Sequence, residues 1–432
     1  MSAQAADSRS LSGYVNLVRT NRSFRYLWYG QIISLLGDWF NLIASATLIG
    51  ELTNSGLAVG GLFVVRMLAP FVVSPFAGVA ADRTNRKHLL ILADVGRAVV
   101  VMGFLLVRRP QDVWLLYVLT AFQLGTSGVF IPTKDSILPD ITTDQEVGTA
   151  NALNATTWST MLALGAALGG VVAGEWGLQP AFLVDSLSFL FSALLISRIF
   201  YRQTTSTDQS GLSPAQVFNQ YISGFSFLRS NPEIFLIAIQ KGFLTLAITS
   251  GFEVIQVQLA SQHFPIGENG STALGLLYAA VGLGTGVSPL LARTLTGDDN
   301  LRMRWAIASG YLFSAIGLLT VSSLFSFQVV WFGTFVRGFG VGIIWVFSTT
   351  LLLKKLPNHI RGRVFGSEYA MFTLLSAIGT PIAGRVLDSI SNPEAPLLWG
   401  MTALTLLLGG VWLVSGVLKQ GRGQASPAAG PL

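Results

Sequence analysis

The stretch Gly78-Val-Ala-Ala-Asp-Arg-Thr-Asn-Arg-Lys87 lies at the junction of two long apolar runs, Leu57–Ala81 and Leu89–Val107. Each run is long enough to cross the roughly 30 Å hydrocarbon core of a bilayer as a helix, because about 20 apolar residues suffice. Short loops rich in Lys and Arg stay on the cytoplasmic side of a membrane. The stretch therefore predicts a cytoplasmic connection between two helices of a polytopic membrane protein.

The composition of the whole chain agrees with lipid as its main solvent. Of its 432 residues, 51% are hydrophobic and only 11% are charged, whereas a soluble domain carries about 25% charged residues. Unclosed strands are excluded, because lipid cannot satisfy their backbone groups. The predicted fold class is an all-α integral membrane protein with twelve transmembrane helices. Their approximate ranges are 26–49, 57–81, 88–107, 112–131, 149–173, 178–199, 233–258, 272–294, 303–324, 327–352, 364–387 and 396–418.

A weak internal repeat divides the chain into two parts. Gly61-Leu-Phe precedes Ser74-Pro75 by thirteen residues, and Gly275-Leu-Leu precedes Ser288-Pro289 by the same distance. Such parallel repeats suit a transporter with its site between two halves. We expect an N-terminal six-helix half, a cytoplasmic linker, a C-terminal six-helix half and a disordered cytoplasmic tail, at residues 1–200, 201–231, 232–420 and 421–432.

The placement of charge predicts the orientation of the helices. Most of the 27 Lys and Arg residues fall on one side of the twelve-helix arrangement, together with both termini. This bias predicts that both termini are cytoplasmic. It also accounts for the net charge of +6 without nucleic acid as a partner. The first twenty residues lack the apolar core of a secretory signal.

No pattern in the chain indicates an enzyme. There is no Cys, and the three His, at positions 88, 263 and 359, lack the spacing of a metal site. No nucleophile and base occur in a recognisable arrangement. We therefore expect no catalytic residue, no cofactor and no metal.

The basic stretch resembles G-x-x-x-D-R-x-G-R-K, the signature between helices 2 and 3 of the major facilitator superfamily, with Asn85 in place of the second Gly. Asn tolerates positive φ better than most residues, so the turn can survive this change. Arg361-Gly-Arg-Val resembles a segment of the macrolide-efflux and enterobactin-exporter branch. The resemblance implies two pseudo-symmetric six-helix halves. It also implies a conformational latch made of Gly78, Asp82, Arg83, Arg86, Lys87, Arg361 and Arg363.

Charges inside the predicted helices are the candidates for mechanism. A charge at the bilayer centre costs about 3 kcal/mol, so it usually forms a pair or lines a water path. Asp38 and Arg66 lie near the middle of helices 1 and 2 and are expected partners. The alternative is a set of purely structural salt bridges, and Asp94 and Arg97, three residues apart, are predicted to form such a local pair.

The resemblance further implies that helices 1, 4, 7 and 10 line a central cavity and that transport follows alternating access. Expected proton-coupling residues are Asp38, Arg66 and Glu253. The expected function is proton-coupled export of amphipathic organic molecules of the drug, macrolide or siderophore type, by a monomer in the inner (plasma) membrane. Expected substrate-cavity residues are Trp39, Asn41, Gln123, Lys241, Gln256, Arg337 and Trp345.

Two other functions remain open at this point. One is uptake or facilitated diffusion without protons. The other is a receptor or lipid-moving scaffold that has lost transport. The expected partners are a small-molecule substrate, protons and the lipid bilayer.

Overall fold

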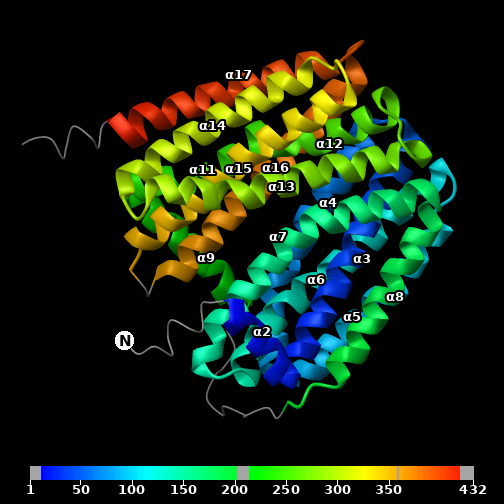
Figure 1. The fold of residues 1–432 in the computed structure, drawn as a ribbon, viewed down its shortest axis with the longest axis vertical. Helices are drawn as coiled ribbons and strands as arrows, with labels where there is room; N and C mark the ends of the chain where they lie inside the picture. The colour runs from blue at the N-terminus through cyan, green and yellow to red at the C-terminus, as the bar shows by residue number, and fades with distance from the viewer. Residues whose placement is uncertain (1–10, 202–213, 358–359, 419–432) are drawn as a thin grey trace, which may run out of the picture. The chain divides into compact units, whose positions relative to one another are not determined.

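The computed structural model describes residues 11–201, 214–357 and 360–418 (Figure 1). Within these ranges, twelve helical segments are long and apolar enough to cross a membrane, which confirms the predicted fold class. Seven of them are single α-helices: α3 (Arg22–Thr53), α4 (Gly56–Arg83), α7 (Asp144–Glu175), α8 (Leu178–Ser197), α14 (Asn300–Ser322), α15 (Phe327–Lys355) and α16 (Arg361–Ser389). Four others combine an α-helix with a short 3-10 or π-helical segment: α5 (Arg86–Met102) with η1 (Gly103–Leu106), η2 (Pro110–Asp112) with α6 (Val113–Ile141), η5 (Glu268–Gly270) with α13 (Ser271–Thr296), and α17 (Glu394–Trp412) with the π-helical η7 (Leu413–Leu418).

The remaining span, the seventh along the chain, is interrupted. It consists of α10 (Pro232–Ala238), α11 (Gln240–Leu244), a π-helical turn η3 (Thr245–Thr249), α12 (Ser250–Gln258) and a second π-helical turn η4 (Leu259–His263). π-Helical turns are rare and occur frequently at functional sites. Shorter helices lie outside the spans, at α2 (Leu11–Thr20) and α9 (Pro214–Ser230).

Most spanning helices are longer than the apolar runs that predicted them. α3 has 32 residues, and it begins where the Asn21 side chain accepts a hydrogen bond from the Phe24 amide. It ends at Asn54, whose φ of 50° is left-handed. At 1.5 Å per residue such a helix is about 48 Å long and extends beyond the roughly 30 Å apolar core. Its two ends are therefore helical although they are polar, which is why the range predicted from hydropathy, 26–49, is shorter than the helix at both ends.

Contacts divide the described chain into two compact units. The first unit comprises 1–54, 61–218 and 259–279, and the second comprises 55–60, 219–258 and 280–432. Each unit therefore includes one short segment that the sequence repeat assigns to the other half. Residues 202–213 of the predicted linker and the whole of the predicted tail, 421–432, lie outside the described residues. The predicted domain boundaries remain predictions.

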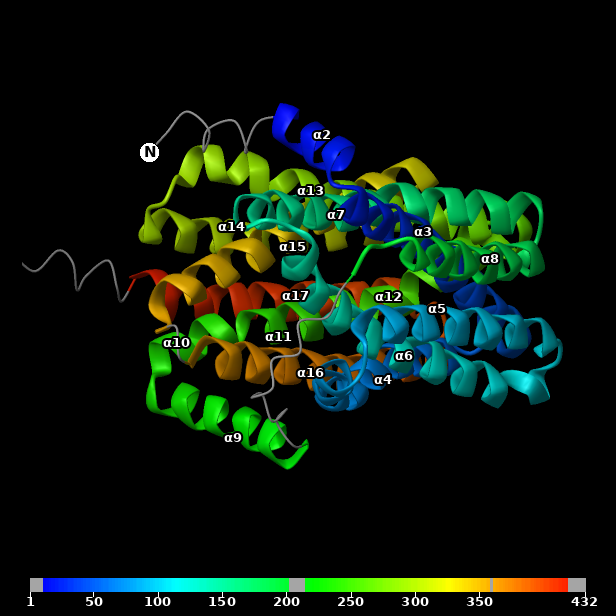
Figure 2. The same ribbon diagram turned by 90° about the horizontal axis from the view of Figure 1, so that it is seen from below.

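In the first unit, α3 packs against α7 and α8, and α5 packs against α6 and α8 (Figure 2). The segment 259–279 joins this unit through α7, where Gly170 and Gly275 bring the two backbones together. A Cβ on either glycine would overlap backbone atoms of the other helix. Thr272 donates a hydrogen bond from Oγ1 to the Gly170 carbonyl at 3.2 Å. Small residues thus permit a close crossing of two helices, as is common in membranes.

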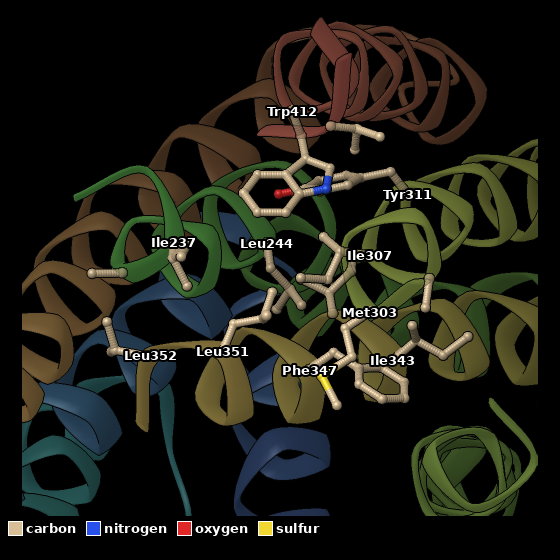
Figure 3. Close-up of a cluster of buried hydrophobic side chains, with 14 of the residues drawn as sticks. Ile237, Leu244, Met303, Ile307, Tyr311, Ile343, Phe347, Leu351, Leu352 and Trp412 are labelled. Carbon is tan, nitrogen blue, oxygen red and sulfur yellow. The ribbon is translucent and has the colours of Figure 1, made fainter. Parts of the chain in front are cut away.

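In the second unit, α14 packs against α15 and α17, and these helices surround a buried apolar cluster (Figure 3). Trp412 and Tyr311 lie next to each other at one side of this cluster. Both satisfy their polar groups: the Trp412 Nε1 donates to the Arg304 carbonyl at 2.9 Å, and the Tyr311 hydroxyl donates to Gln240 Oε1 at 2.7 Å. The cluster holds α11 of the interrupted span in place through Leu244.

Candidate functional site

A cluster of polar side chains links three helices inside the first unit. The Gln123 amide nitrogen on α6 donates to Asp38 Oδ1 on α3 at 3.4 Å and to Asp185 Oδ2 on α8 at 3.3 Å. Gln123 and Asp185 are buried. We call Asp38, Asp94, Arg97, Gln123 and Asp185 the acidic cluster. Two carboxyl groups thus lie within hydrogen-bond distance of one nitrogen.

Gly37, directly before Asp38, allows this approach. A Cβ at position 37 would overlap both Ser188 Oγ and Asp185 Oδ1. Any larger residue would therefore separate α3 from α8 at the level of the carboxyl groups. Ser188 keeps its own hydroxyl satisfied by donating to the Asp185 carbonyl at 2.7 Å. The Gly-Asp sequence in α3 is thus a local requirement for the meeting of the two acids.

Arg97 forms the other part of the acidic cluster. It makes a buried salt bridge with Asp94, three residues earlier on α5, which confirms the predicted pair. Arg97 Nη1 also donates to Ser127 Oγ on α6 at 3.2 Å. Its guanidinium lies over the rings of Phe130 and Phe189, at 4.4 and 4.2 Å from their centroids. Contacts with two aromatic rings favour this position of the charge.

Arg66, the expected partner of Asp38, lies close enough to interact with the charges of both Asp38 and Asp185. Arg97 is a neighbour of the same two carboxyl groups. Several buried polar atoms of the cluster have no hydrogen-bond partner in the structure, among them Asp185 Oδ1, Asp94 Oδ2 and Gln123 Oε1. Such atoms are uncommon in folded proteins. The acidic cluster has room in its hydrogen-bond network for a proton.

The second unit contains a different buried charge pair. Lys241 Nζ on α11 lies 3.0 Å from Glu368 Oε2 on α16, and the two side chains are only 9% and 3% exposed. The Lys241 ammonium also lies 4.7 Å from the ring centroid of Trp345 on α15 and 5.8 Å from that of Phe365. The sequence singled out Lys241 and Trp345 as cavity residues. Glu368 as the direct partner of Lys241 was not predicted.

Three other candidate residues of the second unit lie on α12 and α15. Arg337 donates from Nη1 to the Ile248 carbonyl in the π-helical turn η3 at 3.3 Å, and its guanidinium lies 3.9 Å from the Phe252 ring centroid. Gln256 is buried and Glu253 is half-buried, both on α12. A π-helical turn leaves carbonyl groups out of the regular pattern. Arg337 therefore stabilises the interruption of the seventh span.

Trp39 and Asn41 lie on α3 in the first unit. Trp39 packs on Tyr278, with 5.7 Å between ring centroids, and covers Gly165. Asn41 is buried and accepts a hydrogen bond from Ser45 at 3.1 Å. The seven predicted cavity residues are thus divided between the two units, with Trp39, Asn41 and Gln123 in the first and Lys241, Gln256, Arg337 and Trp345 in the second. Gln123 belongs to the acidic cluster, and Lys241 and Trp345 form one aromatic-flanked pair.

The latch residues make contacts inside their own units. Arg86 pairs with Asp140 at 2.9 Å and donates to the Ser136 carbonyl, while Lys87 donates to the Ile199 carbonyl at 2.8 Å. Asn85 has a φ of −67° and caps α5 by accepting from the His88 amide. The expectation of a positive-φ turn at Asn85 is therefore wrong, because capping a helix start requires extended backbone there.

The structure describes the side chains of only some of the remaining latch residues. Gly78, Asp82 and Arg83 belong to the last turns of α4, but their side chains lie outside the described part of the structure. Arg361 donates to the carbonyls of Leu353 and Leu356 at the end of α15, both at 3.1 Å. Arg363 is exposed. Arg361 thus satisfies carbonyl groups that a helix end leaves open.

Asp388, near the end of α16, was missed by the sequence. Its carboxylate accepts from the backbone amides of Gly56 and Leu57, at 2.6 and 3.0 Å, and from the Ser55 hydroxyl at 2.7 Å. These groups form the start of α4, within the second unit. An acid at a helix start satisfies open amides and suits the helix dipole. No local pattern could predict a cap that lies more than 300 residues away in the sequence.

Within the described ranges, no group of three His, Cys, Asp or Glu side chains lies close enough together to hold a metal ion.

Comparison with known proteins identifies the relatives of this chain. The family model of the Major Facilitator Superfamily matches residues 27–367. YfiS of Bacillus subtilis strain 168, named an uncharacterized MFS-type transporter, is 26% identical over 423 residues, which are 94% of this chain and 96% of that protein. BacE of Bacillus amyloliquefaciens, named as a candidate bacilysin exporter, is 22% identical over 389 residues, which are 90% of this chain and 93% of that protein.

A solved structure shares the fold. The crystal structure of a bacterial homologue of the iron transporter ferroportin, in an inward-facing state, matches with a TM-score of 0.70. The match covers 91% of this chain and 98% of that one, at 14% sequence identity. Helical architecture is thus retained where little sequence is shared.

Proposed function

The chain belongs to the major facilitator superfamily, and we propose that it is a proton-coupled exporter of amphipathic organic small molecules, of the drug, macrolide or siderophore type. It is a multi-pass membrane protein with transporters as its relatives. Export as the direction is supported by the name given to BacE. The assignment to the macrolide-efflux and enterobactin-exporter branch remains a prediction.

One observation carries the proton-coupled part of this proposal. Asp38 and Asp185 reach the same Gln123 nitrogen from different helices inside the first unit. Two carboxyl groups at such short range in a low-dielectric site do not both ionise readily. One of them can hold a proton and release it when the surrounding charges change. Arg66 and Arg97 are the charges that can exert this influence.

The proposed cycle uses this exchange. The proton loads on Asp38 when the acidic cluster is open to the outside, and it leaves when substrate has entered from the cytoplasm. Gln123 keeps the two carboxyl groups together, so a change at either is transmitted to α3 and α8. Glu253 on α12 is the alternative proton site, because it is a half-buried acid of the interrupted span.

The substrate is proposed to contact both aromatic and polar side chains. Lys241 and Trp345 are the members of the predicted cavity set that lie together. The other proposed substrate contacts are Trp39, Asn41, Gln256 and Arg337.

The protein is proposed to act as a monomer in the inner membrane with both termini in the cytoplasm, as the distribution of Lys and Arg predicts. The loop with Arg86 and Lys87 would then lie on the cytoplasmic side. With Gly78, Asp82, Arg83, Arg361 and Arg363, it is proposed to form a latch that favours the outward-facing state. In this orientation the Asp388 cap on α4 lies on the outer side.

The test is proton release from inside-out membrane vesicles that contain the protein. A pH gradient is imposed, and cationic dyes, macrolides and siderophores are added one at a time while the internal pH is followed by fluorescence. Export in exchange for protons predicts that at least one compound dissipates the gradient. Asp38→Asn is expected to lose this response, and Asp112→Asn, which changes an acid in a connecting segment, is expected to keep it.

The same measurement separates the other functions. A carrier without proton coupling would move a labelled compound down its own gradient with no pH change. A receptor or scaffold would give no flux of any compound. Either result would refute the proposed coupling.

A further inference from the structure

The Lys241–Glu368 pair differs from the acidic cluster in its balance of charge. Its two charges are equal and opposite and lie 3.0 Å apart, so neither is in excess. Glu368 nevertheless has an open position, because its second oxygen, Oε1, is buried and has no hydrogen-bond partner in the structure. Glu368 itself is 3% exposed. A buried carboxylate oxygen without a donor points to a missing N–H or O–H group.

Aromatic side chains line one side of this pair. The Trp345 ring lies 4.7 Å from the Lys241 ammonium, and Phe372 meets Trp345 edge-on at 5.5 Å between centroids. Tyr369 stacks on Phe372 at 6.1 Å. Trp345 and Tyr369 are 39% and 41% exposed, although the ion pair beside them is buried. An accessible aromatic surface thus adjoins an inaccessible ion pair.

Tyr369 does not lie on the main exposed apolar stripe of α16. The other exposed apolar residues of that helix are Leu374, Ile378 and Ile382, which follow Tyr369 by five, nine and thirteen positions. At about 100° per residue they lie roughly 140°, 180° and 220° around the helix from Tyr369. Tyr369 therefore faces away from this stripe, and a molecule that reaches it approaches α16 from the other side.

The charge balance of the pair restricts what can bind there. A cation that bound at Glu368 Oε1 would place a second positive charge beside Lys241 with no second negative charge to balance it. An anion that bound at Lys241 would likewise place a second negative charge beside Glu368. An uncompensated charge in a buried site is strongly unfavourable. A ligand that carries both charges close together keeps the site neutral, since its carboxylate meets Lys241 and its ammonium meets Glu368 Oε1.

We propose that the Lys241–Glu368 pair, with Trp345 and Tyr369, is a recognition site for small zwitterions that carry an ammonium and a carboxylate next to each other and an apolar or aromatic side chain. The ammonium donates to Glu368 Oε1 and lies over the Trp345 ring, and the side chain packs on Tyr369 and Phe372. This inference rests on the proposed transport function and names a substrate class for it.

The test uses three probes with the same phenyl group: L-phenylalanine as the zwitterion, phenethylamine as the cation and 3-phenylpropionate as the anion. Binding to the purified full-length protein in detergent is measured at pH 7 by calorimetry. We expect L-phenylalanine to bind at least about tenfold more tightly than either of the others. Equal or tighter binding of the cation or the anion would overturn the proposal, and so would the absence of binding by all three.

Variants separate recognition from folding. Lys241→Met and Glu368→Gln each strand one charge, so each is expected to lose L-phenylalanine binding and to lower the melting temperature. The double variant restores charge balance and folding, and it is expected to bind the three probes within about threefold of one another. Glu394→Gln is the matched control, because Glu394 is a buried acid of the same unit whose partner is Gln258. An undiminished zwitterion preference in the double variant would refute the site.

These results are distinct from a failure of the proposed function. If L-phenylalanine binds with the expected preference but no compound dissipates a pH gradient in vesicles, the site stands and proton-coupled export is wrong. If other compounds dissipate the gradient and L-phenylalanine does not bind, export stands and the zwitterion site is wrong.

Discussion

In the first unit, two aspartates share one glutamine and the influence of two arginines, one of which pairs with a third aspartate, whereas in the second unit one lysine meets one glutamate at 3.0 Å. The acidic cluster has an excess of carboxyl groups and polar neighbours from α3, α5, α6 and α8. The Lys241–Glu368 pair is balanced and flanked by aromatic rings. An excess of acids suits the uptake and release of a proton. A balanced pair beside an aromatic surface suits a ligand with both charges.

From this comparison we propose a division of labour, in which each of the two units carries out a different step of transport. In the proposed cycle, the acidic cluster changes its protonation and the Lys241–Glu368 pair changes its ligand. Neither cluster needs the residues of the other for its own chemistry. Substitutions can therefore disturb one function and spare the other, and the following predictions use this property.

The largest effect is expected for Arg97→Met, which leaves Asp94 buried without its partner. Removal of one member of a buried pair destabilises a protein by about 3–5 kcal/mol. The measurement is the melting temperature and folded yield in detergent. Arg293→Met is the control, since Arg293 pairs with Asp298 on an exposed surface, where such a pair contributes about 0–1 kcal/mol. Similar losses for both variants would show that Arg97 is not a structural anchor of the cluster.

The next effect concerns coupling. Asp38→Asn is expected to reduce gradient-driven accumulation at least about tenfold, which corresponds to about 1.4 kcal/mol, while downhill exchange continues. The amide cannot take up and release a proton in this range of pH. Asp185→Asn is expected to act in the same direction, because it shares Gln123 with Asp38. Should Asp38→Asn keep full accumulation and Glu253→Gln lose it, the proton site would move to the interrupted span.

A third prediction contrasts the two tryptophans. Trp345→Ala is expected to change the relative affinities of transported compounds by several-fold with a small change in melting temperature, because its ring is 39% exposed. Trp39→Ala is expected to lower the melting temperature more, since Trp39 packs on Tyr278 and covers Gly165. Affinities from competition assays and melting curves on the same samples give both quantities. A larger loss of melting temperature for Trp345→Ala and a larger change in affinities for Trp39→Ala would instead assign packing to Trp345 and substrate contact to Trp39.

The smallest effect is expected for Asp388→Ala, which removes the cap from α4. A helix cap contributes about 1 kcal/mol, so we expect a small decrease in melting temperature. The conformational balance should change as well, because the start of α4 loses its attachment to α16. Spin-label distances across the outer side would then broaden or lengthen. Unchanged distances in Asp388→Ala would restrict this residue to local capping.

Hydropathy alone predicted the twelve spans, because each apolar run is a local property of the chain. It predicted an α3 that is too short at both ends, since the helix continues through polar residues to its caps at Asn21 and Asn54. The Asp94–Arg97 pair was predictable from its three-residue spacing on one helix. The interruption of the seventh span at Thr245–Thr249 was not, because no Pro marks it and Arg337 supports it from another helix.

The candidate sites were predicted less completely than the spans, because their residues come from helices that are far apart in the sequence. Asp38, Gln123 and Asp185 lie on three helices far apart in the sequence, and their meeting depends on the close packing that Gly37 permits. Lys241 was predicted as a cavity residue, but its partner Glu368 is 127 residues away. Residue type and depth in a helix identify which charges matter. Only the packing of helices determines which of them pair.

The division of labour is tested most directly by one pair of flux measurements in proteoliposomes, with a labelled compound that the wild-type protein accumulates against a pH gradient. Accumulation with the gradient and exchange without it are measured for Asp38→Asn and Glu368→Gln. The account predicts that Asp38→Asn loses accumulation and retains exchange, whereas Glu368→Gln loses both. Loss of exchange in Asp38→Asn together with full accumulation in Glu368→Gln would contradict it.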